Sequence, residues 1–226
     1  MSNTVLKLQK VTKIFGGKGN VPLVEIFNGM DFSVKTNEVV GLFSPSGSGK
    51  TTFLQIAGLL DSKFSGDIYI NGSIVDAKND FQTSRVRRKN IGFVFQFHHL
   101  IQEFSALENI IFPLLFDGIP KKIAVKKGKD LLEKVGLGKR MDNRPAELSG
   151  GEQQRVAIAR AFACEADVLF CDEPTGNLDS SNSELIANLI FDTFVESSSA
   201  LIIVTHDISL ANRCDQRIEL VDGKVL

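Results

Sequence analysis

The stretch LFSPSGSGKTTFLQ (Leu42–Gln55) contains the residue types that bind phosphate groups. An apolar strand, a Gly/Ser-rich loop and a helix follow one another here, so backbone N–H groups would surround an anion at the start of the helix. Lys50 could reach the β- and γ-phosphates of a nucleotide, and the Thr51 hydroxyl could hold Mg²⁺. The candidate nucleotide-binding residues of this loop are Ser44, Pro45, Ser46, Gly47, Ser48, Gly49, Lys50, Thr51 and Thr52.

Ser44 stands where phosphate-binding loops usually carry their first glycine. If its φ angle is positive, its Cβ costs about 1–3 kcal/mol of backbone strain, whereas an ordinary φ costs little. Ser44 comes before the residues that would surround the phosphate. We therefore expect a working nucleotide site, although Ser44 could lower its affinity for ATP.

Two carboxylates end the apolar segment VLFCDE (Val168–Glu173). An acid at the carboxyl end of a parallel strand points into the crevice where α/β sheets bind ligands. Asp172 could therefore orient Mg²⁺, and Glu173 could polarise the attacking water. Acidic residues also end strands for no catalytic reason, but the presence of a phosphate loop favours the catalytic interpretation.

A second candidate anion site lies in ELSGGEQQRVAIARA (Glu147–Ala161). Ser149, Gly150 and Gly151 would begin a helix whose first N–H groups are free to bind an anion. This segment resembles the signature of the ATP-binding-cassette (ABC) ATPases.

Three further motifs carry the same resemblance. DEPTGNLD (Asp172–Asp179) and VTHD (Val204–Asp207) resemble the D-loop and the switch-histidine motif of that family, and they follow in the expected order. Gln96 in GFVFQ is similar to the Q-loop glutamine. The resemblance extends over essentially the whole chain.

The resemblance implies a homodimer that holds two ATP molecules, each between the phosphate loop of one chain and Ser149–Gly151 of the other. It implies that Gln96 contacts Mg²⁺ and the water, that His206 contacts the γ-phosphate, and that Asp179 links the two sites. Phe15 in VTKIF corresponds to the position at which the family stacks an aromatic ring on adenine, and the ring keeps its π face without a hydroxyl. A role for Phe15 in the core is the alternative.

The segment FQFHHLIQEFSALENIIFPLL (Phe95–Leu115) lies where the family receives the coupling helix of a transmembrane partner. The pair His98–His99, with Leu100 and ALEN, resembles the ATPase subunit of lipoprotein-releasing transporters (LolD type). A metal site or a pH sensor is a weaker interpretation of the two histidines, because no cysteine or carboxylate stands at ligand spacing.

This closer resemblance implies a homodimer bound to transmembrane permease subunits (LolC/LolE type) on the cytoplasmic side of the inner membrane. ATP and Mg²⁺ would be its cofactors, and release of lipoproteins toward the outer membrane its function. The alternative is a cell-division or macrolide-exporter type of ABC ATPase that acts as a nucleotide-gated clamp on its partner.

The elements that must position these residues alternate between strands and helices. Apolar strands separated by helices predict a parallel sheet that is covered on both faces. The family resemblance adds an N-terminal antiparallel β-subdomain and an inserted α-helical subdomain to this P-loop core. We expect one ABC domain over residues 1–226, with the β-subdomain and core at about 1–95 and 165–226, and the helical subdomain at about 97–164.

Composition agrees with a globular protein, because 43% of the residues are hydrophobic and 23% are charged. The net charge of −1 argues against nucleic-acid binding without sequence preference. Cys164, Cys171 and Cys214 make an odd number without a C-x-x-C pair, and we interpret them as reduced thiols. A cluster of lysines in the helical region predicts a solvated face, or alternatively a contact with a membrane or partner: Lys121, Lys122, Lys126, Lys127 and Lys129.

Overall fold

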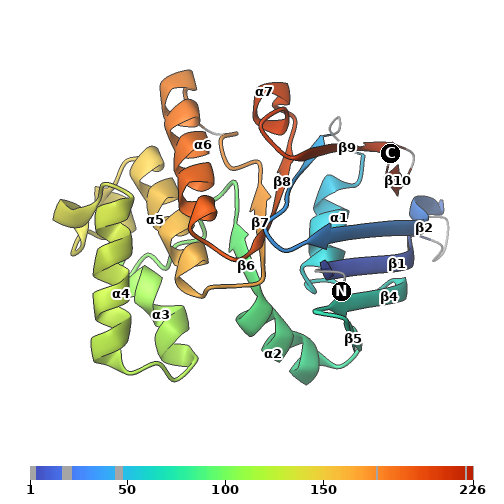
Figure 1. Cartoon of the computed structure of the whole chain (residues 1–226), viewed down its shortest axis with the longest axis horizontal. Helices are drawn as coiled ribbons and strands as arrows, with labels where there is room; N and C mark the ends of the chain where they lie inside the picture. The colour runs from blue at the N-terminus through green and yellow to red at the C-terminus, as the bar shows by residue number, and fades with distance from the viewer. Residues whose placement is uncertain (1–3, 17–21, 44–47, 177, 222, 226) are drawn as a thin grey trace.

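The computed structural model describes residues 4–16, 22–43, 48–176, 178–221 and 223–225. Two sheets, with helices packed around them, form the described part of the molecule (Figure 1). A small antiparallel sheet lies on the right of Figure 1, a larger sheet occupies the centre, and α3, α4 and α5 lie together on the left. This arrangement confirms the predicted P-loop fold with a mostly parallel sheet, an antiparallel β-subdomain and a helical region.

The antiparallel sheet has the strand order β2-β1-β4-β5. Its strands are β1 (Thr4–Phe15), β2 (Val24–Lys35), β4 (Ser65–Ile70) and β5 (Ser73–Val75). Along β2 the side chains of Met30, Phe32 and Val34 are buried, while those between them are exposed. This alternation covers one face of the sheet and leaves the other in solvent.

The larger sheet has the order β10-β9-β3-β8-β7-β6, and only β10 runs antiparallel to its neighbour among the described strands. Successive residues of its central strands enter two different cores. Ile202 belongs to the core shared with the antiparallel sheet, and Ile203 to the core beneath α6. The strands are β3 (Val39–Phe43), β6 (Ile91–Val94), β7 (Val168–Asp172), β8 (Ala200–Thr205), β9 (Gln216–Val221) and β10 (Lys224–Val225).

Helices cover both faces of this sheet, while α3 and α4 pack on α5 away from it. The helices are α1 (Lys50–Ala57), α2 (Asp80–Asn90), α3 (Ala106–Phe116), α4 (Lys121–Lys134), α5 (Gly150–Ala163), α6 (Ser180–Val195) and α7 (Ile208–Ala211), with 3₁₀ turns at Gly138–Arg140 and Pro145–Glu147. A third apolar core joins α3, α4 and α5, with Ile110, Leu132 and Val156 fully buried. Helix α4 ends before a glycine in the left-handed conformation, Gly136 at φ 73°.

Across the described residues, no helix is long and apolar enough to cross a bilayer. The three cysteines are free thiols. In the lysine cluster, Lys121, Lys122, Lys126 and Lys129 are exposed, and Lys127 pairs with Glu165.

Candidate active site

Gly49 begins α1 in a conformation that favours glycine. Its φ is 99°, and a Cβ at this position would lie 2.8 Å from Ile26 Cγ2. Since no acidic side chain lies in the first turn of α1, the N–H groups at this helix end retain their preference for an anion. The buried Ser48 Oγ has no hydrogen-bond partner among the described residues, as expected of a group that binds a ligand. Ser44, Pro45, Ser46 and Gly47 lie outside the described residues.

The structure brings Lys50, Glu173 and His206 together at the carboxyl ends of β7 and β8. The distance from Lys50 Nζ to Glu173 Oε1 is 3.8 Å, and that from His206 Nδ1 to Glu173 Oε2 is 2.8 Å. A carboxylate accepts hydrogen bonds, so this contact suits a His206 ring that donates from Nδ1. The His206 backbone N–H also donates to Glu173 Oε2, at 3.2 Å.

Glu173 has a φ of 43°, which is uncommon for a residue with a side chain. Its backbone N–H donates to the Val204 carbonyl at 2.8 Å, and its carbonyl accepts from Gly176 N–H at 3.0 Å. These bonds hold a strained backbone in place, and such strain is typical of functional sites. His206 itself has an exposed side chain, so the core interpretation of this histidine does not hold.

Asp172, the last residue of β7, lies beside this cluster and is partly buried. Burial raises the pKa of its carboxyl, the charge of Glu173 raises it further, and Lys50 acts in the opposite direction. Two neighbouring carboxylates therefore face a single described lysine, an arrangement in which a divalent cation would offset the excess negative charge. Gln96 lies against the loop that follows, with its Nε2 3.0 Å from where a Cβ on Gly176 would be. Thr51 is exposed in the first turn of α1, and Thr52 is partly buried.

Phe15 lies at the end of β1 with 44% of its surface exposed, so its ring is open to a ligand. The Lys13 ammonium approaches the ring to 4.5 Å from its centroid. A cation held at this distance fixes the ring by an electrostatic attraction. The exposure argues against a core role for Phe15.

Ser149 caps α5 and, with Glu152, forms a capping box: Glu152 N–H donates to Ser149 Oγ at 3.3 Å, and Ser149 N–H donates to Glu152 Oε2 at 2.8 Å. A Cβ on Gly150 would meet no atom within 4 Å, so nothing described in its own chain requires glycine there. In Figure 1, α5 lies to the left of β7 and α1 to its right, which places the second candidate anion site apart from the phosphate loop.

Asp179 caps α6, which was not apparent from the sequence. Its carboxylate accepts from Asn182 N–H at 2.9 Å and from Asn182 Nδ2 at 2.7 Å. The Ser181 hydroxyl and these Asn182 groups hold the pKa of Asp179 well below its ordinary value. Asn182 also lies against the signature segment, since its Oδ1 would be 3.3 Å from a Cβ on Gly151. Asn182 thus joins the D-loop to the start of α5 within one chain.

Sequence reasoning missed Arg160, which fixes the segment after Gln96. Its guanidinium donates to the His99 carbonyl at 2.7 Å and to the His98 carbonyl at 2.8 Å. His99 has a φ of 47°, and burial lowers the pKa of His98. The structure therefore shows that the main chain of the two histidines, as well as their rings, shapes this segment.

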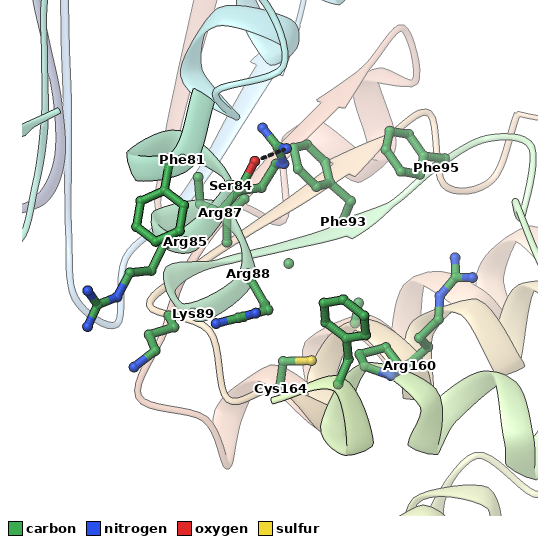
Figure 2. Close-up of a pocket in the computed structure, with 15 residues that line it drawn as sticks. Phe81, Ser84, Arg85, Arg87, Arg88, Lys89, Phe93, Phe95, Arg160 and Cys164 are labelled. Carbon is green, nitrogen blue, oxygen red and sulfur yellow. Dashed lines mark hydrogen bonds between the residues drawn. The ribbon is translucent and has the colours of Figure 1, made fainter. Parts of the chain in front are cut away.

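A groove of 760 Å³ lies between α2, β6, the end of α3 and the end of α5 (Figure 2). Figure 2 shows Arg85, Arg88 and Lys89 of α2 on one side, and Arg160 and Cys164 of α5 across from them. Its apolar lining includes Phe81, Phe93, Phe95, Pro113 and Phe116. The sequence pointed to Phe95 and to the helices α3 and α5, but the groove itself was not predicted, because α2 was not.

Comparison with known proteins identifies the family and the fold of the chain. Residues 27–176 match the family model described as ABC transporter, a span that includes Lys50, Gln96, Ser149–Gly151 and Glu173. The chain is 46% identical over 98% of its length to the lipoprotein-releasing system ATP-binding protein LolD of Aquifex aeolicus, 96% of which is covered. It is 45% identical over 99% of its length to the LolD protein of Ruegeria sp., 98% of which is covered.

A solved structure has the same fold. It is the dimeric post-hydrolysis state of the ATP-binding cassette MJ0796 bound to ADP and Pi, with a TM-score of 0.86 and 36% sequence identity. The match covers 97% of this chain and 96% of that one.

Proposed function

Since the chain belongs to the ABC transporter family and is one of its ATP-hydrolysing subunits, we propose that it drives the release of lipoproteins from the inner membrane toward the outer membrane. The LolD relatives, similar over nearly their whole length, support this cargo. The observation that carries the hydrolytic function is the cluster of Lys50, Glu173 and His206 where β7 and β8 end.

In the proposed reaction, Gly49 and its neighbours in the phosphate loop bind the triphosphate, and Lys50 reaches the β- and γ-phosphates. The γ-phosphate would compete with Glu173 for contacts with Lys50 and His206. Once these two side chains contact the phosphate instead, the Glu173 carboxylate is free to orient and polarise the attacking water. Phe15 would stack on adenine through its exposed ring face.

Mg²⁺ would be held by Thr51, Gln96 and Asp172, and its chemistry is to neutralise charge on the phosphate oxygens. The residues fit this ion because burial and Glu173 both raise the pKa of Asp172, which a cation would reverse. The oxygen ligands are those that Mg²⁺ prefers.

Each ATP site would be completed by a second copy of the chain, whose Ser149–Gly151 binds the γ-phosphate at the start of its α5. Asp179 would link the two sites of this homodimer. The open space around Gly150 supports this proposal. Nothing described in its own chain requires a glycine there, so the space is free for the ATP that the other chain binds.

The groove of Figure 2 would receive a cytoplasmic helix of a transmembrane permease subunit of the LolC/LolE type. Its phenylalanines fit apolar side chains, and the exposed Arg85 and Lys89 fit acidic ones on the same helix. The chain would then be a peripheral protein on the cytoplasmic side of the inner membrane.

Glu173→Gln tests reaction and partner together. We expect the variant to bind ATP while its turnover falls at least about 100-fold, because the amide cannot act as a general base. The tagged, ATP-loaded variant should recover transmembrane subunits with bound lipoprotein from detergent-solubilised inner membranes. A division-site membrane protein with a regulator of cell-wall hydrolases would favour the clamp instead, and recovery of no membrane protein would refute the docking role of the groove.

A matched pair of surface changes provides the control. Phe81 in the groove and Val195 at the end of α6 have similar exposures, 81% and 82%. Phe81→Ser in the Glu173→Gln background should reduce recovery of the membrane subunits, whereas Val195→Ser should not. Equal recovery with both would contradict binding in the groove.

A further inference from the structure

Gln154 lies inside α5, between the groove and the loop that carries Glu173, and only 1% of it is exposed. Its Nε2 donates to the Pro174 carbonyl at 2.9 Å and reaches the Phe95 carbonyl at 3.4 Å. Pro174 follows Glu173, and Phe95 lines the groove immediately before Gln96. One buried amide thus contacts the main chain of both the groove wall and the catalytic loop.

The orientation of this amide is determined by its neighbours. Both main-chain groups are carbonyls, which only accept, so the NH₂ group must face them. The Gln154 Oε1 is then buried without a hydrogen-bond partner among the described residues. Buried polar atoms are rarely left unpaired. The amide therefore joins two segments at the cost of burying an unpaired oxygen, a cost that an apolar side chain would not have.

The catalytic loop depends on such main-chain contacts. Glu173 has its φ at 43°, and a non-glycine residue keeps this conformation only when its surroundings hold it. Val204 holds the Glu173 N–H on one side, and Gln154 holds the next carbonyl, that of Pro174, on the other. A shift of Pro174 would therefore turn the Glu173 carboxylate relative to His206.

The groove wall can transmit a displacement to Gln154. The Phe95 ring stacks on Phe93 with centroids 5.0 Å apart, and its edge meets His99 at the same distance. Figure 2 shows Phe93 and Phe95 along one wall of the groove. A ring packed on both sides moves together with its backbone, so an occupant that presses on Phe95 displaces the carbonyl that Gln154 contacts.

We propose that Gln154 is a positioning residue that transmits occupancy of the groove to Glu173, by contacting the carbonyls of Phe95 and Pro174 at once. The occupant follows from the proposed function, a helix of the membrane partner. The link itself lies within one chain and can be tested without that partner.

Gln153 provides a matched control. It is the neighbouring residue of the same type, and its Nε2 also donates to two carbonyls, those of Pro145 at 3.0 Å and Leu148 at 3.1 Å. Both of these lie in the helical region, and the Gln153 side chain also forms a hydrogen bond with His98. Methionine is close in size to glutamine and removes the donors. Gln154→Met removes a contact with the catalytic loop, whereas Gln153→Met removes none there.

The first measurement is hydrogen–deuterium exchange of the full chain alone. Gln154→Met should speed exchange in residues 95–97 and in residues 174–178 together, with a melting temperature within a few degrees of that of the wild type. Gln153→Met removes the bond to His98, so residues 174–178 should be unchanged in this variant. Faster exchange in only one segment of Gln154→Met, or the same change in both variants, would overturn the proposal.

The second measurement is ATP turnover of the chain assembled with its co-purified membrane subunits. Gln154→Met should reduce the partner-dependent stimulation of kcat about fivefold or more, with the KM for ATP and the binding of the subunits unchanged. Full stimulation in Gln154→Met would overturn the proposal. If the wild type binds no membrane subunit, the proposed function fails, and the exchange measurement still decides whether Gln154 joins the two segments.

Discussion

Lys13 supports the candidate adenine site from beneath the surface. Its side chain is 3% exposed, and its Nζ lies 2.6 Å from Asp61 Oδ2 and 2.7 Å from the Lys63 carbonyl. The same ammonium group faces the ring of Phe15. A partly buried ion pair therefore holds the lysine that faces an exposed aromatic ring, and no local pattern could reveal this contact between residues 48 positions apart.

This ion pair predicts how stability depends on pH. Burial by itself would raise the pKa of Asp61, but the hydrogen bond from Lys13, the Lys63 N–H and both lysine charges outweigh it, so the pKa lies below its ordinary value of 3.8. The stabilisation is then complete above the unfolded pKa and is lost as the pH falls through the lower folded pKa. When the pH is lowered from neutral to about 3, we expect the unfolding free energy to fall less in Asp61→Asn than in the wild type. Urea titration at each pH measures this. Asp130→Asn changes an exposed carboxylate and should behave like the wild type. If the unfolding free energy of Asp61→Asn fell with pH as much as that of the wild type, the ion pair would not be the source of this pH dependence.

At the scale of elements, sequence predicted the strands and helices whose apolar residues follow a regular period. β7 and β8 were found because every residue but one is buried, and α5 because its start carries the Ser149 cap. The sequence also singled out Lys50, Glu173 and His206, which the structure brings together. The roles of the site residues and the domain boundaries stay predictions.

Helix α2 shows why the rest could not be predicted. Its sequence is DFQTSRVRRKN, and Thr83 is its only fully buried residue, so no apolar period marks it as a helix. The groove depends on α2, and its lining joins α2 and β6 to the ends of α3 and α5, which lie further along the chain. The positive φ of Glu173 and the contacts of Gln154 likewise arise from tertiary packing.

The close approach of α3 and α4 yields a second prediction. A Cβ on Gly128 would lie 2.6 Å from Ile111 Cγ2 and 2.8 Å from Leu107 Cδ1. Ile111 is β-branched and cannot easily turn away on a helix. We expect Gly128→Ala to destabilise the protein by about 1 kcal/mol, because overpacking of about 1–3 kcal/mol exceeds the gain of up to 1 kcal/mol in helix propensity. Chemical unfolding measures this change, and Lys129→Ala, at an exposed position of the same helix, is the control. If Gly128→Ala were more stable than the wild type, the two helices would have moved apart to accept the methyl group.

At the scale of the whole molecule, the two parts of the proposed ATP site lie on different sides of the central sheet of one chain. Lys50 and Glu173 lie with α1 and β7, whereas Ser149 and Gly150 begin α5 on the other side (Figure 1). In a homodimer related by a two-fold axis, each half meets its complement in the other copy. Lys50→Met and Gly150→Asp should each then inactivate both sites of their own homodimer.

Mixing these two variants tests the arrangement directly. In a mixed dimer one site carries both changes and the other carries neither, so an equal mixture should regain about a quarter of wild-type turnover if half of the dimers are mixed and one of their two sites works. Gly150 is the informative position, because a Cβ there would meet no described atom of its own chain within 4 Å, and an effect on turnover is therefore expected from what a second chain brings. Steady-state ATPase assays of each variant alone and of the mixture decide the matter. If the mixture stays as inactive as its components, the two halves do not complete each other across the dimer as independent sites.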